Sequence, residues 1–211
     1  MINFENVLRS FPGYILNPAA TYEKNREQGY SYAIATLVIP YAAIILLSCL
    51  LQATDDILTA GTIQFALDLL LFYAIYSLVI YSIQIPVIVF VIHCASKIGN
   101  RYAKFVDSFK ISLIGYTFYI FIIGIFILIN ELFIIFDMNF NIVGLIKYIA
   151  YPLYIIASLL FIRVSAEGIK VLHGLSGMKS YAISAIAVSA AFIVVYLGYF
   201  WIVAIFQFIY F

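Results

Sequence analysis

Long apolar stretches separated by short charged segments run through this chain of 211 residues, and they constrain its fold more than any other feature. Hydrophobic residues make up 66% of the sequence and charged residues only 10%, and the mean hydropathy is +1.11. Soluble domains are about half apolar and about a quarter charged. A chain with this composition has too few polar side chains to cover a water-soluble surface, so it belongs in a lipid bilayer.

Five of the apolar stretches are long enough to cross the hydrocarbon core as helices, which takes about 20 residues. The predicted spans are residues 31–51, 70–95, 111–130, 142–162 and 182–207. They predict an all-α integral membrane protein with a five-helix transmembrane domain in residues 31–211, preceded by cytoplasmic or interfacial helices in residues 1–30. The polar segment from Gln52 to Gln64 predicts a turn, and the segment 132–146 fits either a loop in the headgroups or an extension of the flanking helices.

The N-terminal segment predicts a short amphipathic helix, because its apolar residues recur at the spacing of one helical face. These residues are Phe4, Val7, Leu8, Phe11 and Ile15. Pro12 and Gly13 predict that the helix ends near Phe11 and bends. A helix of this kind lies in the headgroup plane or packs on the spans of its own protein, and the pattern favours neither. Asn17 followed by Pro18 predicts the cap and first residue of a second helix.

Basic residues are strongly segregated between the two sides of the predicted membrane. All of the 11 Lys and Arg residues except Lys147 fall in the N-terminal segment or in the loops before the third and fifth spans. Cytoplasmic loops carry the excess of Lys and Arg. The sequence therefore predicts a cytoplasmic N-terminus and a C-terminus on the outside.

The two basic loops, residues 97–110 and 163–181, are the strongest candidates for a working surface. One interpretation is that they only set topology and attract anionic headgroups, each cation near the surface contributing roughly 1 kcal/mol. The other is that they dock a protein, because aromatic residues among the charges supply contact area. The candidate headgroup-binding or partner-binding residues are Lys97, Gly99, Arg101, Lys104, Phe105, Lys110, Arg163, Lys170, Gly174 and Lys179.

The second basic loop also contains three glycines, Gly168, Gly174 and Gly177, which predict a flexible or tightly turned backbone. Both loops connect spans of the same bundle. We therefore expect helix packing to bring them together, so that their cations form one patch at the cytoplasmic end.

Polar residues and prolines in or beside the spans are candidates for a different kind of site. The polar set consists of Asp68, Gln84, Glu131, Asp137 and Lys147. The ammonium group of Lys147 snorkels to the interface, pairs with a carboxylate or serves transport, and we expect an acid of this set beside it. Pro40, Pro86 and Pro152 each predict a kink in their span.

Motifs for enzyme chemistry do not occur in the sequence: it has no nucleotide-binding loop, zinc spacing or nucleophile motif. We expect no enzymatic activity, no cofactor and no nucleic-acid partner. Cys49 and Cys94 lie in or beside apolar runs and predict packed thiols rather than a disulfide. His93 and His173 both fall on the cytoplasmic side, but two histidines alone are a weak basis for a metal site, and we expect no metal.

Three segments carry a resemblance to a known family. They are NPAATYEKNREQGYSYAIATLVIP before and into the first span, SKIGNRYAKFVDSFKISLIGY into the third, and SAEGIKVLHGLSGMKSYAISAIA into the last. Together they resemble the Yip family of Ypt/Rab-interacting membrane proteins and their prokaryotic relatives over about residues 15–205. The resemblance implies five spans, a cytoplasmic N-terminus, oligomerisation and a role in membrane trafficking through Rab-type GTPases. The loop before the third span has one glycine, Gly99, where the family commonly has a pair.

The sequence thus predicts a non-enzymatic membrane-organising or trafficking-like adaptor that acts through its cytoplasmic basic loops. Its expected partners are anionic lipid headgroups, a second copy of the chain and a cytoplasmic protein. The alternative is a permeation protein, a channel or transporter for a small solute, ion or lipid. Its path would use Gln84, Lys147 and the three prolines inside the spans, because broken helices line the cavities of many transporters.

Overall fold

The structure, a computed structural model, describes residues 4–60, 64–135 and 142–210, and in these ranges it contains seven helices and no strand. The two short N-terminal helices are α1 (Phe4–Leu16) and α2 (Pro18–Lys24). The five long helices are α3 (Tyr30–Ala60), α4 (Gln64–Gly99), α5 (Phe105–Ile135), α6 (Ile142–His173) and α7 (Gly177–Tyr210).

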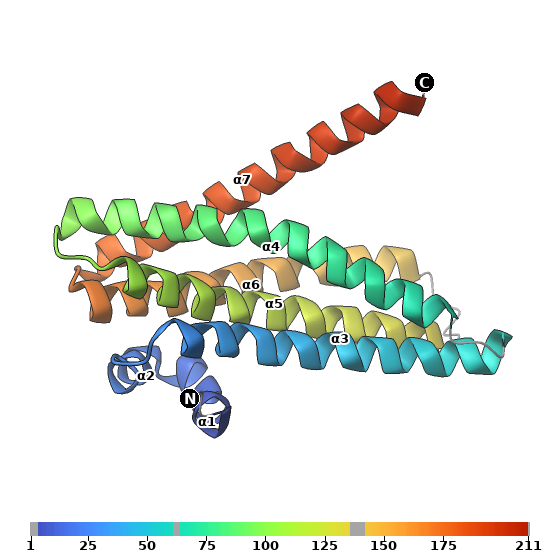
Figure 1. The fold of residues 1–211 in the computed structure, drawn as a ribbon, viewed down its shortest axis with the longest axis horizontal. Helices are drawn as coiled ribbons and strands as arrows, with labels where there is room; N and C mark the ends of the chain where they lie inside the picture. The colour runs from blue at the N-terminus through green and yellow to red at the C-terminus, as the bar shows by residue number, and fades with distance from the viewer. Residues whose placement is uncertain (1–3, 61–63, 136–141, 211) are drawn as a thin grey trace.

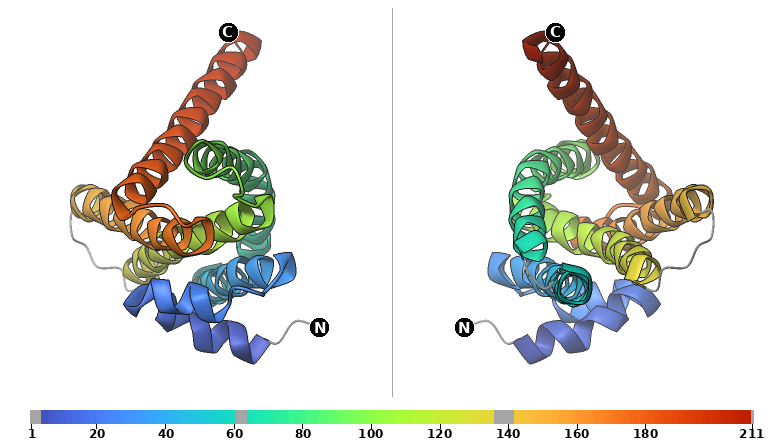
Figure 2. Two further views of the ribbon diagram at one scale, coloured as in Figure 1. Left: turned by 90° about the vertical axis from the view of Figure 1, so that its left-hand side faces the viewer. Right: turned by 90° about the vertical axis from the view of Figure 1, so that its right-hand side faces the viewer.

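The five long helices form a bundle with α1 and α2 against one of its ends (Figure 1). Helix α5 packs on α3 and on α6, and α7 packs on α4 and on α6. The α4–α5 and α6–α7 turns both lie at the end of the bundle that carries α2. The second half of α7 leaves the bundle, as the end-on views of Figure 2 also show.

Four long helices contain stretches that are long and apolar enough to cross a membrane. Within the described residues these stretches are Tyr30–Leu51, Ser82–Gly99, Phe105–Phe126 and Gly177–Val194. They support an all-α, multi-pass membrane protein, as the sequence predicts. Helix α6 is not among the four, so the fifth crossing stays a prediction.

Helix α5 is the centre of the bundle: 61% of its apolar stretch is buried, against 17–28% in the other three. Two glycines let its neighbours come close, as small residues do in membrane helix packing. A Cβ on Gly115 would collide with the Ser165 hydroxyl of α6, and one on Gly124 would collide with the Ile44 side chain of α3. Because α5 is surrounded, its sequence has no polar face.

The helices are longer than the predicted spans, and the prediction of a turn from Gln52 to Gln64 was wrong. Helix α3 continues to Ala60, and α4 begins at Gln64. The physical reason is the lack of a helix breaker, because the first glycine or proline after Pro40 is Gly61. In the segment 132–146 the described residues extend α5 and α6, and residues 136–141 lie outside the described part of the structure.

The predicted end of the first helix near Phe11 was also wrong, because α1 continues through Pro12 to Leu16. Val7 and Tyr14, on either side of the proline, are both buried, and the Phe11 ring packs on Phe118 of α5 at a centroid distance of 4.7 Å. Packing against the bundle therefore compensates for the hydrogen bond that Pro12 cannot donate. Of the two arrangements that the sequence allowed, α1 makes contacts with the spans of its own chain.

Helix α2 begins as predicted. The Asn17 side chain accepts a hydrogen bond from the Ala20 backbone N–H at 3.4 Å, and Pro18 is the first helical residue. Asn25, which follows α2, is 2% exposed, and its Nδ2 donates to the Ser10 hydroxyl at 3.2 Å. This amide ties α2 to α1, so the two short helices form one unit against the bundle.

The two basic loops are mostly helical, and of the two alternatives predicted for the second loop, the backbone is tightly turned at Gly174. Within these two loops, the non-helical residues are 100–104 and 174–176. We call these two short segments the joined turns. Gly168 lies inside α6, where a Cβ would approach the Tyr22 ring at 2.7 Å, so it permits close packing rather than flexibility. Gly174 has a φ of 67°, and its N–H donates to the Lys170 carbonyl at 3.1 Å, which is the left-handed end of α6.

Candidate functional site at the basic end of the bundle

The joined turns are held together by one hydrogen bond and one close contact. Nδ2 of Asn100 donates to the backbone carbonyl of His173 at 2.7 Å. Next to it, a Cβ on Gly99 would come within 2.7 Å of Cδ2 of Leu175, so the end of α4 lies directly on the α6–α7 turn. This contact confirms the expectation that helix packing brings the two basic loops together.

Beneath the joined turns lies a chain of polar side chains from three helices. Nδ1 of His93 on α4 is 3.2 Å from the Ser108 hydroxyl of α5, and this hydroxyl is 3.0 Å from Nε2 of His173 on α6. Ser108 and His173 are almost completely buried. The three polar side chains therefore link α4, α5 and α6 inside the bundle, while Asn100 links the ends of α4 and α6 nearer the surface.

His173 is suited to the neutral form. Its Nδ1 is buried without a hydrogen-bond partner, so a second ring proton would place an unpaired N–H there. The pKa of His173 is lowered from 6.5 to about 4, mainly by burial; the nearby Asp107 opposes the shift, and His93 adds to it. In the neutral ring, an Nε2–H that donates to Ser108 leaves only a lone pair at Nδ1, which costs less than a buried unpaired donor.

The cations that the sequence singled out lie mostly on the surface, and all the exposed ones except Arg163, which is ten residues before the end of α6, lie in the joined turns or within four residues of them. The exposed ones are Lys97, Arg101, Lys104, Arg163, Lys170 and Lys179. Gly99 and Gly174 are exposed as well, and Phe105 is half-exposed with its ring edge-on to His93 at a centroid distance of 5.3 Å. Lys170 has a partner on its own helix, since its ammonium is 3.5 Å from a Glu167 carboxylate oxygen. The end of the bundle thus presents cations together with the half-exposed ring of Phe105 and the exposed ring of Tyr102.

Lys110 does not belong to this surface, which corrects its assignment as a headgroup-binding or partner-binding residue. Its side chain is 2% exposed, and its ammonium donates to the backbone carbonyl of Arg26 at 2.8 Å, with an Asp107 carboxylate oxygen at 3.9 Å. Lys110 therefore fastens the segment between α2 and α3 to α5. Its position in α5, inside an apolar stretch, is explained by this structural role.

Asn100 and Ser108, the two residues that connect the site, are not among the residues predicted from the sequence. An Asn directly after a Gly at a helix end is a local signal for a cap or turn, and it pointed to Asn100. Ser108 had no comparable signal, because its partners are 15 and 65 residues away in the sequence. The described residues contain no cluster of three or more metal-ligating side chains.

The chain matches no known family model, no curated protein and no solved structure. The resemblance to the Yip family therefore stays a hypothesis, and the function is argued below from the residues of this chain.

The polar residues predicted in or beside the membrane are only partly described. Gln84 is 7% exposed, and its Oε1 is buried without a hydrogen-bond partner. The side chains of Asp68, Glu131 and Lys147 lie outside the described part of the structure, as does all of Asp137, so the expected partner of the Lys147 ammonium stays a prediction. Helices α3, α4 and α6 continue on both sides of the prolines inside them, which are Pro40, Pro86 and Pro152.

Replacing Asn100 with Ala is expected to destabilise the protein by about 1–2 kcal/mol, because the His173 carbonyl loses its donor in a partly buried site. The measurement is thermal unfolding in detergent at neutral pH. Lys104→Ala in the same turn is the control, since an exposed surface substitution changes stability by at most about 0.5 kcal/mol. Equal melting temperatures for the two variants would mean that the hydrogen bond does not join the turns in solution.

Proposed function

We propose that this chain is a non-enzymatic, five-span membrane protein whose basic cytoplasmic end binds anionic lipid headgroups and docks an acidic partner surface, as a membrane-organising adaptor of the Yip type. The hydrogen bond between Asn100 and His173 is the observation that carries the proposal. It fixes two segments that are far apart in the sequence as one surface, and it gathers their exposed cations at one end of the bundle.

The charge distribution supports the orientation. The α4–α5 turn, the α6–α7 turn and α2 lie at the same end of the bundle (Figure 1), so the basic residues of all three segments are on one side. By the positive-inside rule this side is cytoplasmic. With α6 as the fifth crossing, the C-terminus is outside.

The N-terminal unit of α1 and α2 is proposed to lie at the cytoplasmic interface. Leu8 and Leu16 of α1 are 59% and 78% exposed, although Val7 and Tyr14 face the bundle. An apolar groove of about 290 Å³ separates α1 from α3 and is lined by Phe11, Ile39 and Pro40, among others. Exposed leucines and an apolar groove are stable where lipid tails reach them, which suits a helix at the boundary of headgroups and acyl chains.

The charge of the joined turns is expected to affect lipid binding, and their shape is expected to affect association with a second copy or a cytoplasmic partner. Lys104→Gln with Lys170→Gln should weaken binding of phosphatidylglycerol to the detergent-solubilised protein by about thirtyfold at low salt, because each cation near a membrane surface contributes roughly 1 kcal/mol before screening. Phe105→Ala should leave this lipid binding unchanged but reduce crosslinking to a second copy or to a cytoplasmic partner, because it removes one of the two exposed aromatic rings at this end, those of Tyr102 and Phe105.

The matched controls are Lys147→Gln, which removes the cation that the proposed topology places on the opposite side of the membrane, and Phe90→Ala, which removes an exposed ring from α4 nine residues before its end. Both control variants should bind lipid and crosslink as the wild-type protein does. If Phe105→Ala associates as wild type does and only the charge variants lose binding, the basic segments are topology signals and the adaptor proposal fails.

The alternative, permeation of a small solute, ion or lipid, has one observation in its favour. Gln84 is a buried amide with an unpaired oxygen, two residues before Pro86 in α4. Polar groups inside the membrane often mark a substrate path. The cavity beside Gln84 measures only about 20 Å³, room for about one water molecule, so it fits a binding pocket better than an open path.

A further inference from the structure

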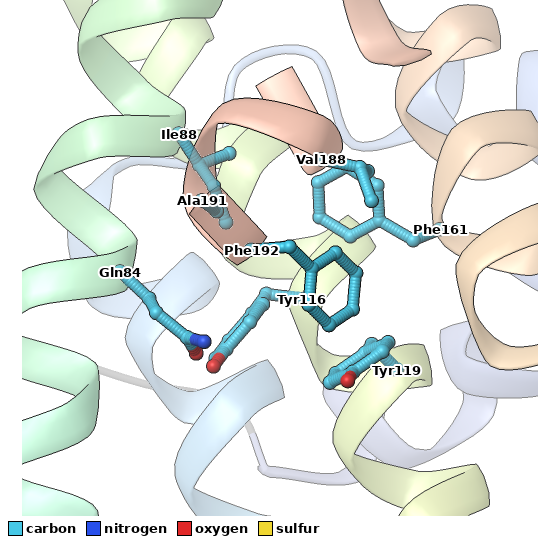
Figure 3. Close-up of a pocket in the computed structure, with 8 residues that line it drawn as sticks. All are labelled: Gln84, Ile88, Tyr116, Tyr119, Phe161, Val188, Ala191 and Phe192. Carbon is cyan, nitrogen blue, oxygen red and sulfur yellow. The ribbon is translucent and has the colours of Figure 1, made fainter. Parts of the chain in front are cut away.

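A small pocket lies inside the bundle, remote from the joined turns. It is lined by four helices through Gln84, Ile88, Tyr116, Phe161, Ala191 and Phe192, among others (Figure 3). Gln84 lies 15 residues before the end of α4 at Gly99, which is about 22 Å at 1.5 Å per residue. Since the hydrocarbon core is about 30 Å thick, the pocket belongs to the interior of the membrane.

The pocket contains one unsatisfied polar group. Oε1 of Gln84 is buried without a hydrogen-bond partner, and Figure 3 shows the amide pointing from α4 across the pocket toward the end of the Tyr116 side chain. The surrounding hydrocarbon core supplies no water to donate a hydrogen bond to this oxygen, so leaving it unpaired costs free energy. This oxygen is therefore an open acceptor for a hydrogen-bond donor on a bound molecule.

Most of the remaining lining is aromatic and apolar, and its other polar atoms are the hydroxyl groups of Tyr116 and Tyr119 (Figure 3). The rings of Tyr116 and Tyr119 are stacked at a centroid distance of 5.8 Å, and Phe192 stands edge-on to Tyr119 at 5.6 Å. A hydroxyl group on a hydrocarbon body needs few partners, because its carbon side can face the rings.

The pocket also lies where two helices part. The second half of α7 diverges from α4 (Figure 1), and Ile193 and Leu197, just beyond the pocket, are more than half exposed. The cavity itself is about 20 Å³, enough for one hydroxyl-sized group but not for a larger body. A ligand held by Gln84 must therefore extend out of the cavity past the exposed Ile193 and Leu197, on the side of the fork where α7 diverges from α4.

From this geometry we propose that the pocket binds the hydroxyl end of a monohydroxy lipid, a long-chain alcohol in chemical class. The hydroxyl donates to Oε1 of Gln84, and the hydrocarbon chain lies in the fork between α4 and α7. The ligand enters from the bilayer rather than from water. This site is independent of the basic end of the bundle, so the adaptor proposal and the proposal for this pocket can be tested separately.

The test is thermal unfolding of the protein in nanodiscs of a zwitterionic phospholipid that contain equal amounts of tetradecanol, tetradecyl methyl ether or tetradecane. Tetradecanol should raise the melting temperature by about 3 °C more than the other two additives, because only the alcohol can donate a hydrogen bond. An equal response to all three, or no response, would overturn the proposal.

Two variants test whether the preference for the alcohol comes from this pocket. Gln84→Leu removes the acceptor, and Ala191→Val fills the pocket from α7, so both should respond equally to the alcohol and the ether. Ile83→Leu is the control, since this side chain is 43% exposed and does not line the pocket, and it should keep the wild-type preference. A preference for the alcohol that persists in Gln84→Leu would place the binding elsewhere and overturn the proposal.

Discussion

Gly168→Val is expected to destabilise the protein by about 3 kcal/mol or more, since overpacking a close contact costs about 1–3 kcal/mol and valine is stiff and branched at Cβ. A Cβ at this position would lie 2.7 Å from Cζ of Tyr22 and 2.9 Å from Cγ1 of Ile111. Both neighbours are buried and belong to different elements, α2 and α5. Neither can move without opening the contact between α6 and the rest of the bundle.

Thermal unfolding in detergent, together with the yield of monodisperse protein, measures this effect. The matched control is Gly29→Val, because a Cβ at Gly29 meets no atom within 4 Å. A Gly168→Val protein as stable as the control would mean that α2 does not lie on α6 at this point. Gly168→Ala should fall between the two, because it introduces the same Cβ without the branches.

Local chemistry explains which parts of the fold the sequence could predict. The start of α2 depends on Asn17 and Pro18 alone. Four of the five predicted spans overlap with apolar stretches of the structure, and the first of them agrees to within one residue. The ends of the long helices were predicted poorly. Polar residues mark where a span leaves the hydrocarbon core, but they do not end the helix, which can continue in water. Gly61 shows which signal was informative, since α3 ends at Ala60 directly before it.

The site required information that no local pattern contains. Asn100 and His173 are 73 residues apart, and Lys110 finds its acceptor on Arg26, 84 residues away. Counting charges placed Lys110 on a basic surface, whereas packing buried it. Gly168 was ambiguous for the same reason, because a glycine that frees the backbone and one that admits a neighbouring ring look alike in a sequence.

Acidification is expected to destabilise the protein through His173. The pKa of His173 is lowered to about 4 by burial in the folded state, against 6.5 for the ordinary imidazole, so folding favours the neutral ring. The stabilisation is complete above about pH 6.5 and is lost progressively as the pH falls toward 4. By linkage, the free energy of unfolding should decrease by about 2 kcal/mol between pH 7 and pH 5 from this residue.

The groups that face the His173 ring are Ser108 and His93, with Asp107 near enough to oppose the effect of burial. His173→Gln removes the titration and keeps a side chain that can bond Ser108. It should be less stable than wild type at pH 8, but its stability should change less between pH 7 and pH 5. His93→Gln is the second control and should keep most of the wild-type pH dependence. If His173→Gln loses as much stability on acidification as wild type, another group carries the pH dependence, and the buried neutral imidazole beneath the joined turns is not the cause.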